Sequence, residues 1–180
     1  TAVERGLACV LQMQIRVHGT PTGWGQQHDA QTLETTAART FEPACTSPAD
    51  TTEIVRFLMR IEKPSPEIVA AVDAAVAWLR AVKLTGIRVE RVAAPAVEFF
   101  RHKADFDVVV VPDEKAPPLW ARVVEVGTNR PIFASRDGVK VYSLAEVDRE
   151  RRTGSGWYGN WPRRLIESEY PKWRAGVARN

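Results

Sequence analysis

The sequence predicts a mainly α-helical protein with a small antiparallel β-sheet inserted into the helical body. Helical spacing of apolar residues, accompanied by capping signals, recurs from Glu4 to Thr85. After Gly86 the pattern changes to short alternating or β-branched runs separated by turn-forming residues. One domain accommodates both halves, because 180 residues build one core and are too few for two.

Three helices are expected in the first half of the chain. The first covers Glu4 to Val17 and carries one apolar stripe that needs a partner surface. The second runs from about Ser47 to Ile61, where Ser47 and Pro48 resemble a cap and a first-turn proline. The third starts at Ser65 and Pro66 and stops at Thr85-Gly86; its single apolar stripe makes it the clearest element.

The second half is expected to form the sheet and two further helices. The strand candidates are Ile87–Val92, Asp107–Val111, Trp120–Val126 and, after an Asp-Gly turn, Lys140–Tyr142, with Ala93–Asp105 and Pro112–Pro118 as connections. Ser143 to Glu146 has capping-box spacing and begins a short polar helix that ends near Gly154. A last helix is predicted from Arg163 to Arg174, broken near Pro171.

The stretch from Thr20 to Arg39 combines an aromatic ring with many polar groups. It holds Trp24 close to His28 and Asp29, and a short helix or turn from Thr32 to Thr40 presents its arginine. A flat apolar ring beside hydrogen-bonding groups suits a sugar, which has apolar faces and hydroxyl edges. A loop anchored by the tryptophan and capped by the aspartate explains the same residues, and both interpretations stay open.

Arginines and aromatic residues recur together in the loops. Arg39, Arg130 and Arg136 stand at the ends of loops or elements, away from obvious helical partners, and a guanidinium binds a carboxylate through two parallel hydrogen bonds. The glycine-rich loop near the C-terminus adds rings and an amide that can contact a sugar: Trp157, Tyr158, Asn160 and Trp161. The alternatives are bracing of the turn from 129 to 138 by its arginines and closure of the core by the tryptophans.

Composition narrows the function class. The 44% hydrophobic and 26% charged fractions are ordinary for a globular protein, and no apolar run approaches the length of a membrane span. Cys9 and Cys45 fit no metal-binding spacing and are expected to form a buried thiol pair or one disulfide. Residues 130–180 carry 11 Lys and Arg against 6 Asp and Glu, yet no nucleic-acid recognition element is evident, and Arg149 to Arg152 is interpreted as a solvated helix face.

Catalysis by the common side-chain arrangements has little support. No Gly-x-Ser-x-Gly motif is present, and the Gly-x-Gly at 154–156 lacks the buried strand that a phosphate-binding loop follows. A pair of carboxylates for glycoside hydrolysis can be drawn from four candidates, but no spacing singles out a pair. These candidates are Asp29, Glu34, Glu42 and Asp137.

Taken together, the segments resemble the family ten polysaccharide lyases, which are pectate lyases built on an (α/α) toroid. The matching strings follow one another over nearly the whole chain: LQMQIRVHGTPTGWGQQHDAQTL, AARTFEPA, IVRFLMRIEKPSPEIVAAVDAAVAWL, GIRVERV, APPLWARVVEVGTNRPIFASRDGVKVYSLAEV and ERRTGSGWYGNWPRRL. The resemblance implies a mainly α fold, a partial (α/α) toroid with a small antiparallel β-sheet insertion. It also implies that residues 1–180 are the C-terminal part of a catalytic domain whose N-terminal half is missing.

The resemblance implies calcium-assisted β-elimination of polygalacturonate, which yields 4,5-unsaturated products. A base removes the C5 proton while Ca²⁺ and cationic side chains neutralise the uronate carboxylate. By motif position the base is Arg39, with Arg56 as the alternative, and no calcium ligands are assigned. The remaining motif residues are expected to bind substrate: Trp24, His28, Asp29, Arg130, Arg136, Trp157, Tyr158 and Asn160. A secreted or periplasmic monomer is expected.

The sequence departs from the family pattern at Gly25, where a cysteine is expected, at Thr36, where a proline is expected, and in the loop from Cys45 to Glu53. We expect the 180-residue chain alone to show no lyase activity, because an acidic motif of the missing half contributes to the site. Two other hypotheses are a non-catalytic polyuronate-binding module and a toroidal glycoside hydrolase.

Overall fold

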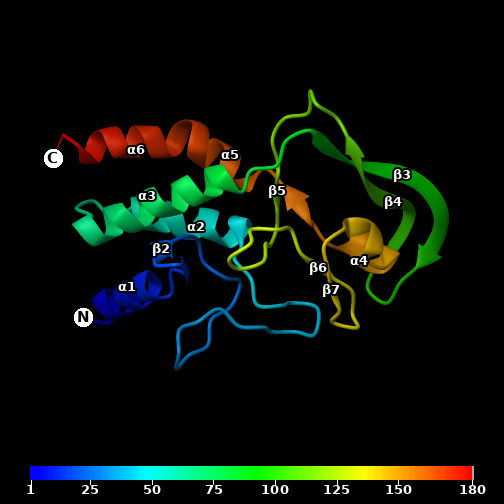
Figure 1. Ribbon diagram of the computed structural model, residues 1–180, viewed down its shortest axis with the longest axis horizontal. Coiled ribbons are helices and arrows are strands. Elements are labelled where there is room, and N and C mark those ends of the chain that lie inside the picture. The colour runs from blue at the N-terminus through cyan, green and yellow to red at the C-terminus, as the bar shows by residue number, and fades with distance from the viewer. Residues whose placement is uncertain (180) are drawn as a thin grey trace.

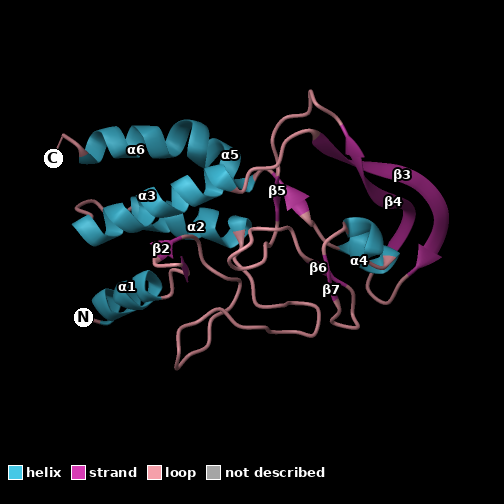
Figure 2. Cartoon of the chain, viewed as in Figure 1, coloured by secondary structure: helices cyan, strands magenta, loops and turns pink. Residues whose placement is uncertain are grey.

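The computed structural model describes residues 1–179 and divides them into a helical end and an end made of strands and loops (Figure 1). Helices hold 36% of the residues and strands 23%, so the fold is not mainly α. Most of the helices stack in one group, while one short helix near the C-terminus lies apart beside the ribbon (Figure 2), and no ring of helices forms among the described residues. The predicted partial (α/α) toroid is therefore wrong.

Local capping explains where the helices begin. Helix α1 (Ala2–Gln12) starts at a capping box formed by Thr1 and Glu4. The Ser47 side chain accepts a hydrogen bond from the Asp50 N–H and caps α2 (Pro48–Met59); Ser65 caps α3 (Pro66–Ala81) in the same way. Helices α2 and α3 confirm the predictions made from their apolar stripes and caps.

Helix α1 is shorter than predicted. The chain leaves the helix after Gln12 and forms a tight hairpin in which β1 (Arg16–Val17) pairs with β2 (Thr20–Pro21). The turn places His18 and Gly19 at positive φ, 49° and 81°. The pairing begins before this turn: the Ile15 N–H donates to the Gly23 carbonyl at 2.9 Å, and the Ile15 carbonyl accepts from the Thr22 N–H at 2.7 Å. The chain is therefore extended ahead of Val17, and the expected continuation of the helix to Val17 is wrong.

The C-terminal helix continues where a break was predicted. Helix α5 (Trp161–Arg164) runs through a π-helical turn (Leu165–Glu169) directly into α6 (Tyr170–Val177). Pro171 lacks the N–H for a regular helical bond, and the wider π turn ahead of it makes room for its ring. The irregularity therefore changes the hydrogen-bond pattern without ending the helix.

The main core lies between α2 and α3. Leu58, Val72, Val76 and Leu79 are fully buried there, and Trp120 packs against them and donates its indole N–H to the Leu79 carbonyl at 2.7 Å. A smaller core at the strand-rich end contains Phe133, Leu144, Val147 and Trp157. The two cores hold the helical end and the loop-rich end together.

The largest strand element is a two-stranded antiparallel ribbon, β3 (Ile87–Glu98) and β4 (Lys103–Pro112). Its strands include most of the segment predicted as a connection, Ala93–Asp105. The register shifts between Ala93 and Val97, and this bulge accommodates Pro95 and bends the ribbon. Figure 1 shows the ribbon curving around helix α4 (Arg149–Gly154).

The remaining strands are short pairs and not a third strand of the ribbon. Strand β5 (Trp120–Ala121) pairs with β8 (Tyr158–Gly159), which corrects the predicted strand from 120 to 126. Strand β6 (Phe133–Ala134) pairs with β7 (Lys140–Val141) across the turn with the Asp-Gly signal. A 3-10 turn (Leu144–Glu146) with the predicted capping box precedes α4.

One face of α4 fastens the ribbon. The Arg149 guanidinium donates to the carbonyl oxygens of Pro95 at 2.8 Å and Phe106 at 2.9 Å, and so bridges the two strands at the bulge. Arg152 binds both carboxylate oxygens of Asp107, at 2.9 and 2.6 Å. The basic run is therefore engaged in structure, and its interpretation as a solvated helix face is wrong.

Replacing Asp107 by Asn is expected to lower the free energy of unfolding at pH 7 by about 1–2 kcal/mol, because a charge-assisted contact is lost. The hydrogen bonds from Arg152 hold the pKa of Asp107 below its ordinary value of 3.8. The contribution is therefore complete above pH 3.8 and lost as the pH falls through the lower folded pKa. Urea unfolding of both proteins at several pH values tests this: the difference should shrink in acid, and a constant difference would contradict it.

Candidate functional site

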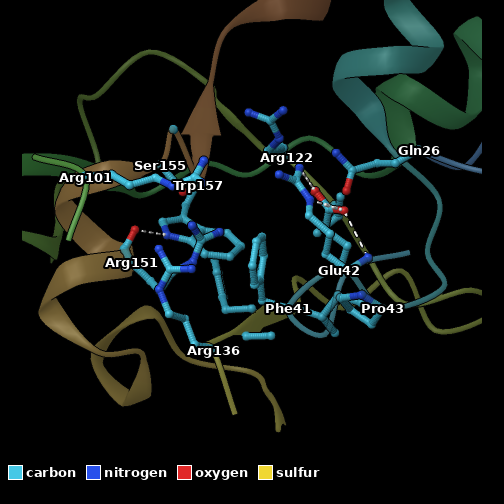
Figure 3. A pocket seen from close by; sticks show the side chains of 17 residues that line it. Gln26, Phe41, Glu42, Pro43, Arg101, Arg122, Arg136, Arg151, Ser155 and Trp157 are labelled. Atoms are coloured by element: carbon cyan, nitrogen blue, oxygen red, sulfur yellow. Dashed lines mark hydrogen bonds and ion pairs between the residues drawn. The ribbon is translucent and has the colours of Figure 1, made fainter. Parts of the chain in front are cut away.

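A basic pocket lies between the loop that follows β2, the turn around β6, and α4 (Figure 3). Its cavity volume is about 430 Å³, within the range of small-ligand sites. Five guanidinium groups line it, together with the rings of Phe41, Phe133 and Trp157; the arginines are Arg39, Arg101, Arg122, Arg136 and Arg151. Such a wall favours an anionic ligand that also has apolar surface.

Three of the arginines surround one aromatic ring. The guanidinium carbon of Arg151 lies 4.2 Å from the centroid of Phe41, and those of Arg39 and Arg136 lie 5.1 and 5.5 Å from it. The ring attracts each cation through its face and separates like charges that would otherwise repel. Phe41 therefore gathers guanidinium groups from three different segments of the chain.

Two of these arginines are held by carboxylates. Arg39 makes a two-pronged contact with Glu42, in which its Nε lies 2.8 Å from one carboxylate oxygen. Arg136 binds Glu150 of α4 in the same manner, at 2.7 and 2.5 Å. These hydrogen bonds raise the pKa of both arginines and lower the pKa of both carboxyl groups. The guanidinium planes are thereby fixed at the rim of the pocket.

Arg151 differs from the other two. Burial lowers the pKa of Arg151, and the positive charges of Arg136 and Arg39 lower it further. Its Nε is buried and lacks a hydrogen-bond partner within the described residues. A buried donor without a partner is uncommon, and of these three arginines Arg151 is the one that no carboxylate of the described residues holds.

Sequence reasoning did not select Arg101, Arg122 or Arg151. Arg122 and Arg101 are exposed and gain significance only because the fold brings them to one wall. Arg151 follows Glu150 in a charged run typical of a solvated face, and no periodicity can be read from a six-residue helix. The one sequence signal for Arg151 was that it lies a few residues before the aromatic glycine-rich loop.

Of the three residues of the C-terminal loop that were predicted to bind ligand, only Trp157 lines the pocket. Trp157 is 7% exposed, donates its indole N–H to the Arg151 carbonyl at 2.9 Å, and packs edge-on against Phe133. Trp157 therefore packs in the smaller core and also forms part of the pocket wall. Tyr158 lies in an adjacent groove along the ribbon, and burial raises its pKa to about 12. Asn160 is exposed and precedes the first residue of α5 (Trp161–Arg164).

Trp24 offers no face to a sugar. Its ring is fully buried in the main core, its indole N–H donates to the Val10 carbonyl at 2.7 Å, and its backbone N–H donates to Thr51 Oγ1 at 2.9 Å. The prediction that it stacks on substrate is therefore corrected, and the anchored-loop alternative describes this residue. Long-range partners that are not visible in the local sequence decide between the two roles.

His28 and Asp29 also brace the loop. His28 accepts a hydrogen bond from the Gly25 N–H at 3.0 Å through Nε2, so its Nδ1 donates to the Leu33 carbonyl at 2.8 Å. The Asp29 carboxylate accepts from the backbone N–H groups of Gln31 and Thr32, and these bonds lower its pKa. The segment from 32 to 40 is irregular and forms no helix. Neither side chain lines the arginine pocket.

The departures from the family pattern have local explanations. A Cβ on Gly25 would overlap Thr35 Oγ1 and lie 2.9 Å from the Cys45 carbonyl oxygen, so a larger residue does not fit. The Thr36 N–H donates to the Gln27 carbonyl at 3.1 Å, a bond that proline cannot make. In the segment from Cys45 to Glu53, Ser47 supplies the cap of α2.

The other predicted arginines lie outside the pocket. Arg130 stacks on Tyr142, with 3.7 Å between its guanidinium carbon and the ring centroid. Arg56 binds Glu169 at 2.8 Å and Glu53 at 2.7 Å on the helical end, and these carboxylates raise its pKa. Of the two arginines considered as base, only Arg39 lines the pocket.

The described residues contain no group of three or more His, Cys, Asp or Glu side chains arranged to hold a metal ion. Cys9 and Cys45 are free thiols and not a disulfide, and burial raises the pKa of Cys45 to about 11. Within residues 1–179 no helix has the length and apolar character needed to cross a membrane.

The fold and the pocket define a protein that gathers guanidinium groups beside aromatic rings in one cavity. The sequence model of the pectic acid lyases matches residues 1–166, so the chain belongs to the pectic acid lyase family. This membership confirms the resemblance seen in the sequence. No curated protein matches the sequence significantly.

Two solved structures are similar over nearly the whole chain. One is the family 10 polysaccharide lyase from Cellvibrio cellulosa, with 29% identity and a TM-score of 0.78 over 96% of this chain and 50% of that one. The other is a mutant of a family 10 polysaccharide lyase from the same organism in complex with trigalacturonic acid, with 29% identity and a TM-score of 0.77 over 94% of this chain and 50% of that one. The chain therefore spans about half the length of these lyases.

Proposed function

We propose that this chain forms the arginine-rich side of a pectate lyase site that acts on polygalacturonate. The observation that carries the proposal is the group formed by Arg39, Arg136 and Arg151 around Phe41. A galacturonate unit offers a carboxylate to the guanidinium groups and an apolar face to the ring. A similar lyase was solved in complex with trigalacturonic acid, which supports this class of ligand.

The proposed reaction is β-elimination. A base takes the proton from C5, the C5–H electron pair forms the C4–C5 double bond, and the C4–oxygen bond breaks. The departing oxygen keeps that bonding pair and takes up a proton. The neighbouring carboxylate makes the C5 proton hard to remove until its charge is neutralised, and positive groups at fixed positions provide this stabilisation. Arg136 and Arg151 line the pocket, which supports this role for them.

We assign the base to Arg39 in preference to Arg56. A guanidinium must lose a proton before it can act as a base, and its high ordinary pKa opposes this. In this structure Glu42 raises that pKa further, so Arg39 must leave Glu42 to react. Once Arg39 has left Glu42, the positive charges of Arg136 and Arg151 favour the neutral form of the Arg39 side chain, because a third positive charge beside them is unfavourable.

Calcium remains a prediction from the family resemblance. Glu42 in the pocket wall is held by Arg39, Glu150 of α4 is held by Arg136, and residues 1–179 hold no metal-binding cluster. These residues do not fit a calcium site by themselves. The expected secreted or periplasmic location and the monomeric state are likewise proposals.

Trigalacturonate is expected to bind this 180-residue chain equally well with and without a calcium chelator, because arginines and not a metal ion receive its carboxylates. Titration calorimetry with and without EDTA measures this. A neutral galactose trisaccharide is the matched control and should bind far more weakly. Loss of trigalacturonate binding in EDTA would show that calcium, and not the arginines, holds the ligand.

The two other hypotheses differ in their chemistry. A glycoside hydrolase needs a pair of carboxylates across a cavity, and of Asp29, Glu34, Glu42 and Asp137 only Glu42 lines the arginine pocket. Asp29 and Asp137 instead accept backbone hydrogen bonds in turns. A polyuronate-binding module would use the same arginines without turnover, and product formation separates it from the lyase.

A further inference from the structure

The turn of the β3–β4 ribbon delivers one basic side chain to the arginine pocket. Arg101 lies in this turn and lines the pocket near Ser155 and Trp157. Figure 3 shows it entering from the ribbon side, across the pocket from Gln26 and Glu42. Its guanidinium carbon lies 5.8 Å from the ring centroid of Phe100, and no carboxylate within residues 1–179 pairs with it.

The neighbouring histidine holds this turn against α4. His102 Nε2 lies 2.8 Å from Thr153 Oγ1, and the threonine hydroxyl donates its single proton to the Arg149 carbonyl at 2.8 Å. The His102 Nε2–H is therefore the donor in the first bond. Phe99 packs on the imidazole with ring centroids 5.1 Å apart and closes the turn through its N–H to the His102 carbonyl at 2.8 Å.

Gly154 provides the room for this contact. A Cβ at Gly154 would lie 2.8 Å from Cε1 and 3.2 Å from Nδ1 of His102, so a side chain would displace the imidazole. The same short helix carries Arg151 into the pocket, while its other face binds the ribbon through Arg149 and Arg152. Helix α4 thus sets the position of the ribbon turn relative to the pocket.

We propose that Arg101 is a specificity residue that binds the carboxylate of a second uronate unit, next to the one held around Phe41. The proposal rests on the proposed pectate lyase function and deepens it. Arg39, Arg136 and Arg151 share Phe41, whereas Arg101 has no such contact with Phe41 and lines the same pocket from the ribbon turn. Two guanidinium groups in different places suit successive carboxylates of one polymer, so Arg101 acts on binding and not on proton transfer.

The test compares ligands of two lengths on the natural full-length protein. Arg101→Ala is expected to weaken binding of trigalacturonate by about three- to tenfold, as for loss of one partly exposed charged contact. Binding of the galacturonate monosaccharide, which occupies only the group of Arg39, Arg136 and Arg151 around Phe41, should not change. Arg101→Lys should restore part of the trigalacturonate affinity, because it keeps the charge without the planar fork.

Lys103→Ala is the matched control, because it removes the same charge from the same end of the ribbon at a residue outside the pocket. It should leave both affinities unchanged. Gly154→Ala is the second variant: it keeps Arg101 and displaces His102, and should weaken trigalacturonate binding selectively. Equal losses for both ligands in Arg101→Ala, or an equal effect of Lys103→Ala, would overturn the inference.

The inference and the proposed function fail in distinguishable ways. If the natural protein cleaves polygalacturonate but Arg101→Ala binds trigalacturonate like the parent, only the role of Arg101 is wrong. If the natural protein forms no unsaturated product, the proposed function is wrong, whatever the ligand-length comparison gives. The affinity measurement needs no turnover and therefore remains informative in both cases.

Discussion

Replacing Arg39 by alanine is expected to lower kcat of the natural full-length protein on polygalacturonate by about 10²- to 10⁴-fold, the usual effect of removing a positioned base. Affinity for trigalacturonate should fall much less, because the other arginines of the pocket remain. The rate of unsaturated-product formation and the affinity from calorimetry measure the two effects separately. A loss confined to kcat identifies a group that acts in the transition state.

Arg56→Ala is the control for this variant. It removes the same side chain from α2, where Arg56 binds Glu53 and Glu169 and does not line the pocket. It should keep kcat, with some loss of thermal stability. If Arg39→Ala kept its turnover while Arg56→Ala lost it, the base would be assigned to the wrong arginine.

Replacing Trp24 by alanine is expected to lower the free energy of unfolding by about 3–5 kcal/mol, as for other large side chains removed from a core. The ring is fully buried, and its loss also leaves the Val10 carbonyl without its indole donor. Phe100→Ala is the control, since that ring is 86% exposed and its removal should change stability little. Urea unfolding of the three proteins gives the comparison.

Trp24→Phe separates the core role from a ligand role. The variant keeps most of the buried volume and loses the indole hydrogen bond, so we expect a loss of about 1–2 kcal/mol. The folded variant should bind trigalacturonate like the parent, because Trp24 has no exposed face. A stable Trp24→Phe protein with greatly weakened binding would restore the interpretation of this residue as a sugar-stacking ring.

The elements that could be predicted from sequence are those with local causes. Helices α2 and α3 were predicted because Ser47 and Ser65 cap them and each buries one apolar stripe. The ribbon was predicted too short, because the segment around Pro95 is typical of a connection. In the structure a bulge accommodates Pro95 within the strand, and the Arg149 guanidinium bridges both strands there. The toroid came from family resemblance, and no local pattern in the chain tested it.

The site was predicted in part. Arg39, Arg136 and Trp157 do meet at one pocket, because loop ends next to turn-forming residues are where exposed guanidinium groups collect. Arg122 and Arg151 were missed because neither stands beside a turn-forming residue, and only the fold brings them to this wall. Trp24 was misassigned because its partners Val10 and Thr51 are contributed by α1 and α2, outside the loop that holds it.

The ultraviolet absorbance of polygalacturonate incubated with the natural full-length protein tests the lyase assignment most directly. We expect a rise in absorbance from 4,5-unsaturated ends, absent in Arg39→Ala, and no rise with the 180-residue chain alone. Cleavage that yields only saturated ends would identify a hydrolase. Tight binding without any cleavage would identify a polyuronate-binding module, and either result would contradict the lyase assignment.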